Sequence, residues 1–266
     1  MSREERVVGG AERGEGKRKR QAAGAVTAAR GGGGPSRGVV AGIAIVVVLA
    51  VVVGVGVWLQ NRNKPADLPV AIPAAAAGPE YGVAVQGDTV VIGSPQAPVT
   101  IDVYEDFLCP GCGQFENLYH QRLAQAAADG KARVVYHPVA ILDRLSVPAG
   151  YSTLAAGATF CAAQAGIFPR FHDSLFAAQP AEGGPAWTIA QLQQLGRGLG
   201  AGDSFASCVQ AGAEQRVAAA TEGAKRYIGG LRPDGRFGTP SVVVNGALTD
   251  TDDRAWLDQA LSGARR

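Results

Sequence analysis

Residues 99–112 read VTIDVYEDFLCPGC and carry the most informative pattern in the chain. Its first part alternates and is rich in β-branched residues, which predicts a strand over Val99–Tyr104. From Cys112 to Ala128 the apolar spacing becomes helical, and Gly130 closes that segment. Two cysteines separated by two residues therefore lie where a predicted strand gives way to a predicted helix.

Further strands flank this stretch, and a long helical block separates the last strand from the others. Thr89–Ile92, Arg133–His137 and Ser241–Val244 are predicted strands, whereas residues 149–228 are mostly helical in pattern. A strand–helix–strand unit of this length gives parallel neighbouring strands with a right-handed crossover. The sequence therefore predicts an α/β domain over residues 88–266. A helical insert occupies about residues 149–228 of this domain.

The formal net charge of +2 is the sum of two oppositely charged parts. Residues 1–37 contain nine Lys or Arg and four Asp or Glu, whereas the chain from residue 65 onward contains 14 and 19. A basic tail can attract the phosphates of nucleic acid. A solvated cytoplasmic tail fits better, because an apolar segment follows directly, and we expect no nucleic-acid partner.

Residues 39–59 read VVAGIAIVVVLAVVVGVGVWL and carry no charge. About 20 apolar residues cross a bilayer as a helix, whereas the hydrophobic region of a cleavable signal peptide has about 7–15. We therefore expect a single transmembrane anchor over residues 38–60, with the basic N-terminus in the cytoplasm. Cleavage near Ala74–Ala77 is the alternative. The Pro- and Ala-rich residues 61–87 are expected to be an extended linker, which places residues 88–266 outside the cytoplasm at the cell membrane.

Cys109 lies at the predicted start of a helix, a position that favours a negative charge on its sulfur. Unpaired backbone N–H groups and the helix dipole stabilise a thiolate there, and a thiolate of lowered pKa is both a nucleophile and a good leaving group. Cys112, one turn later, can close a small disulfide ring with it. A redox motif fits an exported domain with this strand–helix context.

Two other interpretations of the cysteines are a zinc site and a purely structural disulfide. Zinc requires about four ligands, but Cys161 and Cys208 are far apart in the chain and the three His are scattered. We therefore expect no metal, and no soluble cofactor, because sulfur carries out the redox chemistry itself.

The sequence resembles the DsbA-like branch of thioredoxin-fold thiol–disulfide oxidoreductases over about residues 88–266. The resemblance rests on residues 106–112 (DFLCPGC), the helix that follows, the helical insert, and Gly238-Thr239-Pro240-Ser241 before a strand. The layout is similar to that of membrane-anchored actinobacterial members. The resemblance implies that Pro240 is a cis-proline facing the active-site disulfide and that Thr239 pairs through its backbone with an extended substrate. Considered alone, Thr239-Pro240 would be an ordinary turn.

The chain departs from the family pattern at two positions. Many members have a buried carboxylate six residues before the first cysteine, which helps to move the proton of the second thiol, but Val103 occupies that position here. Glu105 and Asp106 could take over this proton relay, or could be solvated loop charges. Strong oxidases of the family often have His between the cysteines, where this chain has Gly111. We therefore predict that the pKa of Cys109 is less depressed than in those strong oxidases, and that this protein is a weaker oxidant than they are.

Cys161 and Cys208 both lie in the predicted helical insert. A leftover pair in an oxidising compartment is expected to form a disulfide, and some actinobacterial members of the family carry a comparable second bond; two buried free thiols are the alternative. His120 is expected at the surface, and His172 is expected to pack among aromatic residues.

The resemblance implies an enzyme that introduces disulfides into exported, unfolded or reduced proteins through Cys109 and Cys112. Its reoxidation would require a quinone-linked membrane protein of the VKOR-like or DsbB-like kind. The same site could instead work as a thiol reductase or isomerase. A non-redox thioredoxin-like binding or chaperone domain is the third hypothesis.

Overall fold

The computed structural model of this chain describes residues 48–56 and 68–263. The chain divides into two units, Met1–Leu59 and Gln60–Arg266. Residues 48–56 are helical, whereas the rest of the expected anchor and the basic tail lie outside the described residues. Within the described ranges, no helix has both the length and the apolar character that crossing a membrane requires.

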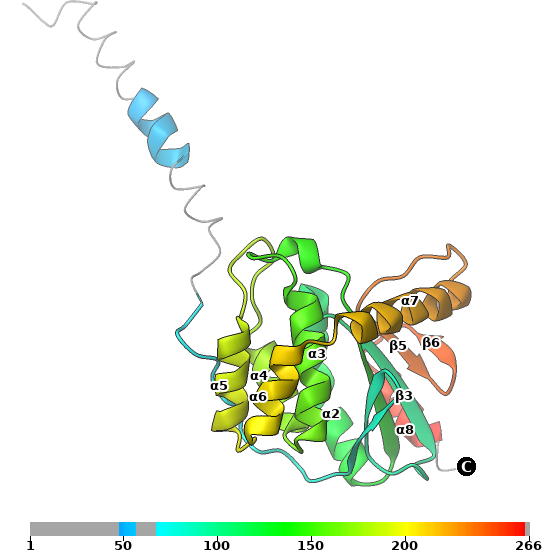
Figure 1. Cartoon of the computed structure of the whole chain (residues 1–266). Coiled ribbons are helices and arrows are strands. Elements are labelled where there is room, and N and C mark those ends of the chain that lie inside the picture. The colour runs from blue at the N-terminus through cyan, green and yellow to red at the C-terminus, as the bar shows by residue number, and fades with distance from the viewer. Residues whose placement is uncertain (1–47, 57–67, 264–266) are drawn as a thin grey trace, which may run out of the picture. The chain divides into compact units, whose positions relative to one another are not determined.

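In the described part of the chain, the second unit is built on a six-stranded mixed sheet (Figure 1). The strands are β1 (Val83–Gln86), β2 (Thr89–Ile92), β3 (Val99–Glu105), β4 (Ala132–Pro138), β5 (Ser241–Val244) and β6 (Ala247–Thr249). Their order is β1-β2-β4-β3-β5-β6. Strands β3 and β4 are parallel and every other neighbouring pair is antiparallel. The predicted parallel strand–helix–strand unit is therefore confirmed.

Helix α2 (Pro110–Ala128) connects β3 to β4, and a helical block separates β4 from β5. The block contains η1 (Asp143–Leu145), α3 (Tyr151–Gln164), α4 (Phe168–Ala177), α5 (Ile189–Gly198), α6 (Asp203–Ala211) and α7 (Glu214–Leu231), and α8 (Trp256–Gly263) ends the domain. In Figure 1, α4, α5 and α6 gather beside α3, whereas α7 extends toward β5 and β6. The predicted insert of residues 149–228 matches α3 to α7 within three residues.

Strand β3 lies at the centre of the sheet, between β4 and β5, and most of its side chains are buried. Val99, Ile101 and Val103 are almost completely buried and belong to the same core cluster as Phe115 and Leu123 of α2. Burying each such side chain contributes about 1.5–3 kcal/mol. A second core lies within the helical block and includes Tyr151, Phe171, Trp187, Leu192 and Phe205. The end of β3, where the cysteine motif begins, thus lies between two cores.

The folded domain begins before residue 88, which corrects the boundary expected from the sequence. Val83–Gln86, within the expected linker, form β1 and pair with β2 in an antiparallel hairpin. Gly87 at the turn has φ +54°, a left-handed conformation that glycine adopts without steric cost. The four-residue strand VAVQ is too short to stand out in a Pro- and Ala-rich region.

Residues 68–82, called the strap below, also pack on the domain rather than forming a free spacer. Ile72 is 6% exposed and lies in the core of the helical block. The Ala75 N–H donates to Ser174 Oγ at 2.8 Å, and Arg170 Nε donates to the Ala75 carbonyl at 2.9 Å. The strap is therefore fixed to α4 by one buried side chain and by backbone hydrogen bonds.

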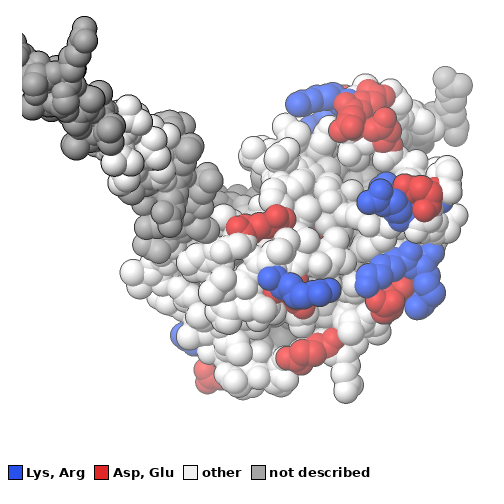
Figure 2. Space-filling model, turned by 90° about the horizontal axis from the view of Figure 1, so that it is seen from above, with Lys and Arg blue, Asp and Glu red and all other residues white. Residues whose placement is uncertain are grey.

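Charged side chains are mixed by sign on the face drawn in Figure 2, where Lys and Arg lie next to Asp and Glu. On α7, Lys225 Nζ lies 2.7 Å from Glu222 Oε1. Exposed pairs of this kind contribute roughly 0–1 kcal/mol. Because the two signs are interspersed, the described residues of this face form no extended patch of one charge.

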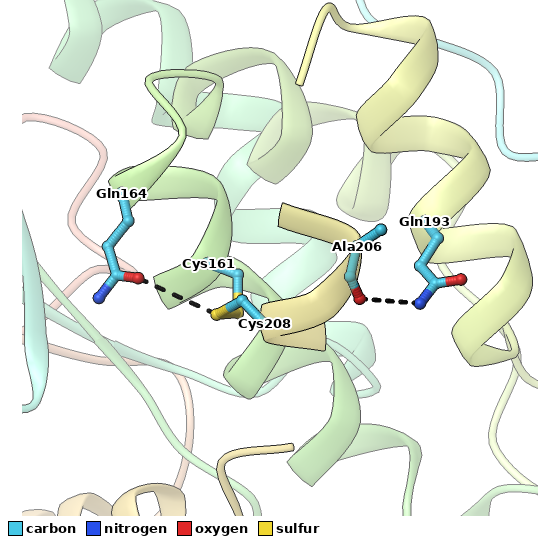
Figure 3. The surroundings of a disulfide bond; sticks show 5 residues. All are labelled: Cys161, Gln164, Gln193, Ala206 and Cys208. Carbon is cyan, nitrogen blue, oxygen red and sulfur yellow. Dashed lines mark hydrogen bonds between the residues drawn. A yellow bond between two sulfur atoms is a disulfide. The ribbon is translucent and has the colours of Figure 1, made fainter. Parts of the chain in front are cut away.

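Cys161 and Cys208 form a disulfide between α3 and α6, with a Cα–Cα distance of 5.8 Å (Figure 3). Cys161 is buried and Cys208 is half-buried. Gln193 Nε2 of α5 donates to the Ala206 carbonyl of α6 at 2.9 Å (Figure 3). Helix α6, which carries Cys208, is therefore also hydrogen-bonded to α5. The expected bonding of this pair is thus present in the structure.

Removing this bond should destabilise the domain. For the double variant Cys161→Ala/Cys208→Ala we expect the free energy of unfolding to fall by about 3–4 kcal/mol, because a disulfide that closes a loop of this length restricts the unfolded chain. Urea denaturation of the wild type and the variant measures the difference. Full reduction of the wild type should lower its stability to that of the variant. A difference below about 1 kcal/mol would contradict the expectation.

Candidate active site

The cysteine motif occupies the junction between β3 and α2. Cys109 is the N-cap residue of α2 and Pro110 is its first helical residue, a position where the missing N–H of proline leaves no hydrogen bond unmade. The Cys109 N–H donates to the Asp106 carbonyl at 3.0 Å, and the Gly113 N–H donates to the Cys109 carbonyl at 3.1 Å. Cys109 is 8% exposed and Cys112 is fully buried, and both thiols are free. The structure thus shows a reduced dithiol.

The loop before β5 lies against Cys109. The Thr239-Pro240 peptide bond is cis, and the Cys109 thiol donates to the Thr239 carbonyl at 3.3 Å. A Cβ atom at Gly111 would lie only 3.1 Å from Pro240 Cδ, so the glycine between the cysteines permits this close approach. The structure therefore brings together four of the residues expected at the site: both cysteines, Thr239 and Pro240.

The surroundings of the two thiols separate their acidities. A hydrogen bond from Cys112 lowers the pKa of Cys109 to about 6, against the opposing effect of burial. Burial raises the pKa of Cys112 well above its ordinary value, and the hydrogen bond to Cys109 adds to this. At neutral pH Cys109 is therefore the thiolate, whereas Cys112 keeps its proton.

The pH dependence of alkylation should reveal this difference. Only the thiolate reacts with iodoacetamide, so the alkylation rate of Cys109 in the reduced protein should rise with pH and reach half its maximum near pH 6. In Cys112→Ala the midpoint should move up toward the ordinary thiol value of about 8.5, because the main cause of the lowering is gone. A wild-type midpoint of about 8 or above, or equal midpoints in the two proteins, would contradict this account of the site.

Asp106 is fully buried and connects the active-site turn to the helical block. Its carboxylate accepts hydrogen bonds from the backbone N–H groups of Leu108, Ile141 and Leu142 and from Ser152 Oγ, at 2.7 to 3.0 Å. Burial raises the pKa of Asp106, and these four hydrogen bonds oppose that rise. The alternative of a solvated loop charge is wrong for this residue, whose contacts indicate a positioning role.

Glu105 is also buried, at 1% exposed, and pairs with His172 of α4. His172 Nε2 lies 2.9 Å from Glu105 Oε1, and His172 Nδ1 lies 3.2 Å from Asp173 Oδ1. Burial would lower the pKa of His172, but the charge of Glu105 and hydrogen bonds to Asp173 and Glu105 hold it above the ordinary value. The negative charge of Glu105 also contributes to the raised pKa of Cys112. The alternative of a solvated charge is therefore wrong for Glu105 as well.

Sequence reasoning missed Glu116, whose side chain lies in the same buried cluster as Glu105 and His172. The signal was its position on α2, since Cys112, Phe115, Glu116 and Tyr119 share the buried helix face. Burial raises the pKa of Glu116 well above its ordinary value. His172 packs among aromatic rings as predicted, but its pairing with Glu105 was not foreseen.

Sequence reasoning also missed Gln179, which follows α4 and reaches the active-site turn. Its Nε2 donates to the carbonyls of Phe107 at 3.1 Å and Cys109 at 2.9 Å. A Cβ atom at Gly113 would press on the side-chain amide of Gln179, which would have to move, so the glycine leaves room for the amide in its present position. Gln179 therefore fixes the helical block to the peptide that carries the reactive sulfur.

A cavity of about 570 Å³ opens beside the motif, between α2, α4 and the strap. Pro110 and Gly113 line its end near the cysteines, and Glu116 and Asp173 line its wall. His120, expected at the surface, is half-buried there, and its Nδ1 lies 2.7 Å from the Glu116 carbonyl oxygen.

A CxxC motif at the N-terminus of the helix after a central strand, with a cis-proline loop against its first sulfur, defines a thioredoxin-fold oxidoreductase domain. Residues 85–261 match the protein-family profile described as Thioredoxin. The chain belongs to this family, and its resemblance to the DsbA-like branch is confirmed by the solved structures below.

Three solved structures show how similar this chain is to thiol–disulfide oxidoreductases of actinobacteria. Reduced DsbA of Mycobacterium tuberculosis has 28% identity and a TM-score of 0.53, covering 67% of this chain and 100% of that one. Reduced DsbG of the same organism has 28% identity and a TM-score of 0.52, covering 68% and 95%. MdbA of Corynebacterium matruchotii has 21% identity and a TM-score of 0.60, covering 69% and 92%, and this likeness concerns the fold.

Among curated proteins, the chain is 32% identical over 180 residues to the serine/threonine-protein kinase PknE of Mycobacterium tuberculosis. The match covers 65% of this chain and 31% of that kinase. The chain therefore spans about a third of the length of the curated relatives that it matches.

Proposed function

We propose that this protein is a membrane-anchored, extracytoplasmic thiol–disulfide oxidoreductase that forms disulfides in exported proteins. The observation that carries the proposal is the Cys109 sulfur, which lies at the N-terminus of α2, 3.3 Å from the Thr239 carbonyl, and has a pKa lowered to about 6. Buried Cys112 is one helical turn away and keeps its proton. Cys109 is therefore suited to exchange with substrates, and Cys112 to form and release the intramolecular disulfide with Cys109.

In the proposed cycle the enzyme starts with a Cys109–Cys112 disulfide. A substrate thiolate attacks Cys109 Sγ and forms a mixed disulfide, and Cys112 leaves as a thiolate that takes up a proton. The second substrate thiolate then attacks the substrate sulfur, which completes the substrate disulfide and releases Cys109 as a thiolate. Two electrons have passed from the substrate to the two enzyme cysteines.

The lowered pKa of Cys109 favours this direction of electron flow. A stable Cys109 thiolate is a better leaving group and stabilises the reduced enzyme, which makes the oxidised enzyme a stronger oxidant. A pKa of about 6 lies between the values of about 3.5 in DsbA and about 7 in thioredoxin. The site therefore supports an oxidant weaker than DsbA, as the glycine between the cysteines led us to expect.

The proposed substrates are exported proteins in unfolded or reduced form. The cis-Pro240 loop places the backbone of Thr239 beside the sulfur, where an extended segment of any sequence can pair with it. Reoxidation is assigned to a quinone-linked membrane protein of the VKOR-like or DsbB-like kind. The uncharged residues 39–59 after a basic tail support the anchor, and the charge bias favours a cytoplasmic N-terminus with the domain outside.

Refolding of reduced, unfolded ribonuclease tests the activity. Catalytic amounts of the oxidised full chain should accelerate the return of ribonuclease activity, and Cys109→Ser should abolish the acceleration. Cys161→Ala/Cys208→Ala is the matched control: it removes two cysteines outside the motif and should retain the acceleration at a temperature where it is folded. No acceleration by the wild type, or equal acceleration by Cys109→Ser, would favour the binding or chaperone hypothesis. Reduction of insulin without oxidation of ribonuclease would favour the reductase.

A further inference from the structure

Three side chains with metal-ligating atoms converge where β3, α2 and α4 meet. Glu105, Glu116 and His172 each place one such atom within 4.8 Å of the other two. Glu105 Oε1 and His172 Nε2 are already 2.9 Å apart. All three residues are at most 2% exposed. Because Glu105 and His172 are 67 positions apart in the chain, the sequence did not indicate this cluster, and the expectation of no metal considered only the cysteines and scattered histidines.

The cluster has more acceptor atoms than the described residues satisfy. Glu105 Oε2 and both carboxylate oxygens of Glu116 have no hydrogen-bond partner within the described part of the chain. A buried carboxylate without a partner is costly, and buried charges in proteins are paired or coordinate metals. Three unpartnered oxygens beside one imidazole therefore point to a ligand that accepts electron pairs.

The orientation of His172 is that of a metal ligand. Its Nδ1 lies 3.2 Å from Asp173 Oδ1, and its Nε2 lies 2.9 Å from Glu105 Oε1. Metal-binding histidines typically donate the ring N–H opposite the metal to a carboxylate or carbonyl, which sets the tautomer and orients the ring. Aromatic rings surround this imidazole, among them Phe107, Tyr136 and Phe176, and such an apolar shell strengthens electrostatic interactions within it.

The cluster has a route to solvent. Glu116 and Asp173 line the cavity of about 570 Å³ between α2, α4 and the strap. The carboxylate oxygens of Glu116 are themselves shielded from solvent, so a cation would reach them from the cavity through a rotation of the Glu116 side chain.

We infer that Glu105, Glu116 and His172 form a binding site for a divalent transition-metal cation, for which Zn²⁺ is the probe. One imidazole nitrogen with carboxylate oxygens suits Zn²⁺ and its first-row neighbours, whereas Mg²⁺ and Ca²⁺ prefer oxygen ligands alone. Tetrahedral ligands at roughly 2.1 Å from zinc lie roughly 3.4 Å apart, so a small movement of Glu116 closes the site. The cation takes the place of the proton between His172 and Glu105, and a fourth position remains for water from the cavity.

The test uses the full chain carrying Cys109→Ser and Cys112→Ser, because cysteine thiolates are themselves zinc ligands. Calorimetric titration of this protein should show one Zn²⁺ per chain and no binding of Mg²⁺. Co²⁺, which replaces Zn²⁺ and absorbs visible light, should give a d–d spectrum without thiolate bands. Adding Glu116→Gln should weaken Zn²⁺ binding at least 100-fold, and adding Asp173→Asn should weaken it roughly 10–100-fold. Glu182→Gln removes an exposed carboxylate elsewhere and should leave the affinity unchanged.

Thermal unfolding separates loss of binding from loss of folding. Without metal, the Glu116→Gln protein should unfold at about the same temperature as its parent, because the neutral amide has nearly the same size as the unpartnered carboxyl group that it replaces. Zn²⁺ should raise the unfolding temperature of the parent and leave that of the variant unchanged. Absence of one-to-one binding in the parent would overturn the inference. Retention of tight binding in Glu116→Gln, or an equal loss in Glu182→Gln, would overturn it as well. None of these measurements depends on oxidoreductase activity.

Discussion

The Cys112→Ala variant should accumulate as a covalent mixed disulfide with proteins that contain disulfides. Its remaining Cys109 thiolate attacks a substrate disulfide and expels one substrate sulfur as a thiolate, which leaves Cys109 joined to the other. In the wild type, Cys112 lies one turn away on the same helix and releases the substrate by an intramolecular attack, for which effective concentrations are very high. We therefore expect the adduct of the variant to live at least ~10³-fold longer than that of the wild type.

Non-reducing gel electrophoresis after mixing the reduced variant with oxidised ribonuclease measures the trapped adduct. The reaction is run near pH 8, because removing Cys112 also removes the hydrogen bond that lowers the pKa of Cys109. Cys109→Ala/Cys112→Ala should give no adduct, and dithiothreitol should release the adduct of the single variant. An adduct of equal lifetime in the wild type would exclude Cys112 as the resolving thiol. Adduct formation in the double variant would place the reactive sulfur elsewhere.

The parts of the fold that could be predicted from the sequence are those set by local pattern. The alternation in β3 and the helical spacing after Cys112 are properties of adjacent residues, and their order alone implies a parallel pair. The cis-Pro240 loop was foreseen only through the resemblance, because it lies 130 residues from Cys109 in sequence and no local pattern connects the two.

The surroundings of the motif could not be predicted, because they depend on where the helical block lies. Glu105 and Asp106 are adjacent acidic residues at the end of one strand, and nothing local distinguishes a solvated charge from a buried one. The hydrogen-bond partners of Asp106 include Ser152 and the loop containing Ile141. The partner of Glu105 is His172 on α4. These partners lie 35 to 67 residues away along the chain. A single sequence does not show which residues so far apart come into contact.

The strap escaped prediction for a related reason. Its composition is that of a spacer, and only one of its side chains, Ile72, is buried in the core of the helical block. Backbone hydrogen bonds at Ala75 fix the rest, and these need no particular side chain. A segment attached mainly through its backbone leaves little trace in hydrophobic periodicity.

The Asp106→Ala variant should lose about 3–5 kcal/mol of stability, the range for removing one partner from a buried charged network. Three backbone N–H groups and the Ser152 hydroxyl would lose their acceptor inside the protein, and each unsatisfied buried group is costly. Urea denaturation measures the loss, with Asp102→Asn as the matched control. Asp102 pairs with His137 alone among side chains and is partly exposed, so its loss should stay below about 1 kcal/mol.

Asp106→Ala should also change the chemistry of the dithiol, because the Asp106 N–H donates to Cys112 Sγ at 3.5 Å and its carbonyl accepts from the Cys109 N–H. Both contacts are made by the backbone of Asp106. The four hydrogen bonds of the Asp106 carboxylate hold this backbone in place. Loosening it should shift the alkylation midpoint of Cys109, whereas a side chain that only stabilises the core would leave that midpoint at the wild-type value. A destabilisation below about 1 kcal/mol would show that the buried carboxylate does not hold the turn. If the variant loses the expected amount of about 3–5 kcal/mol but the alkylation midpoint of Cys109 is unchanged, Asp106 supports only the helical block.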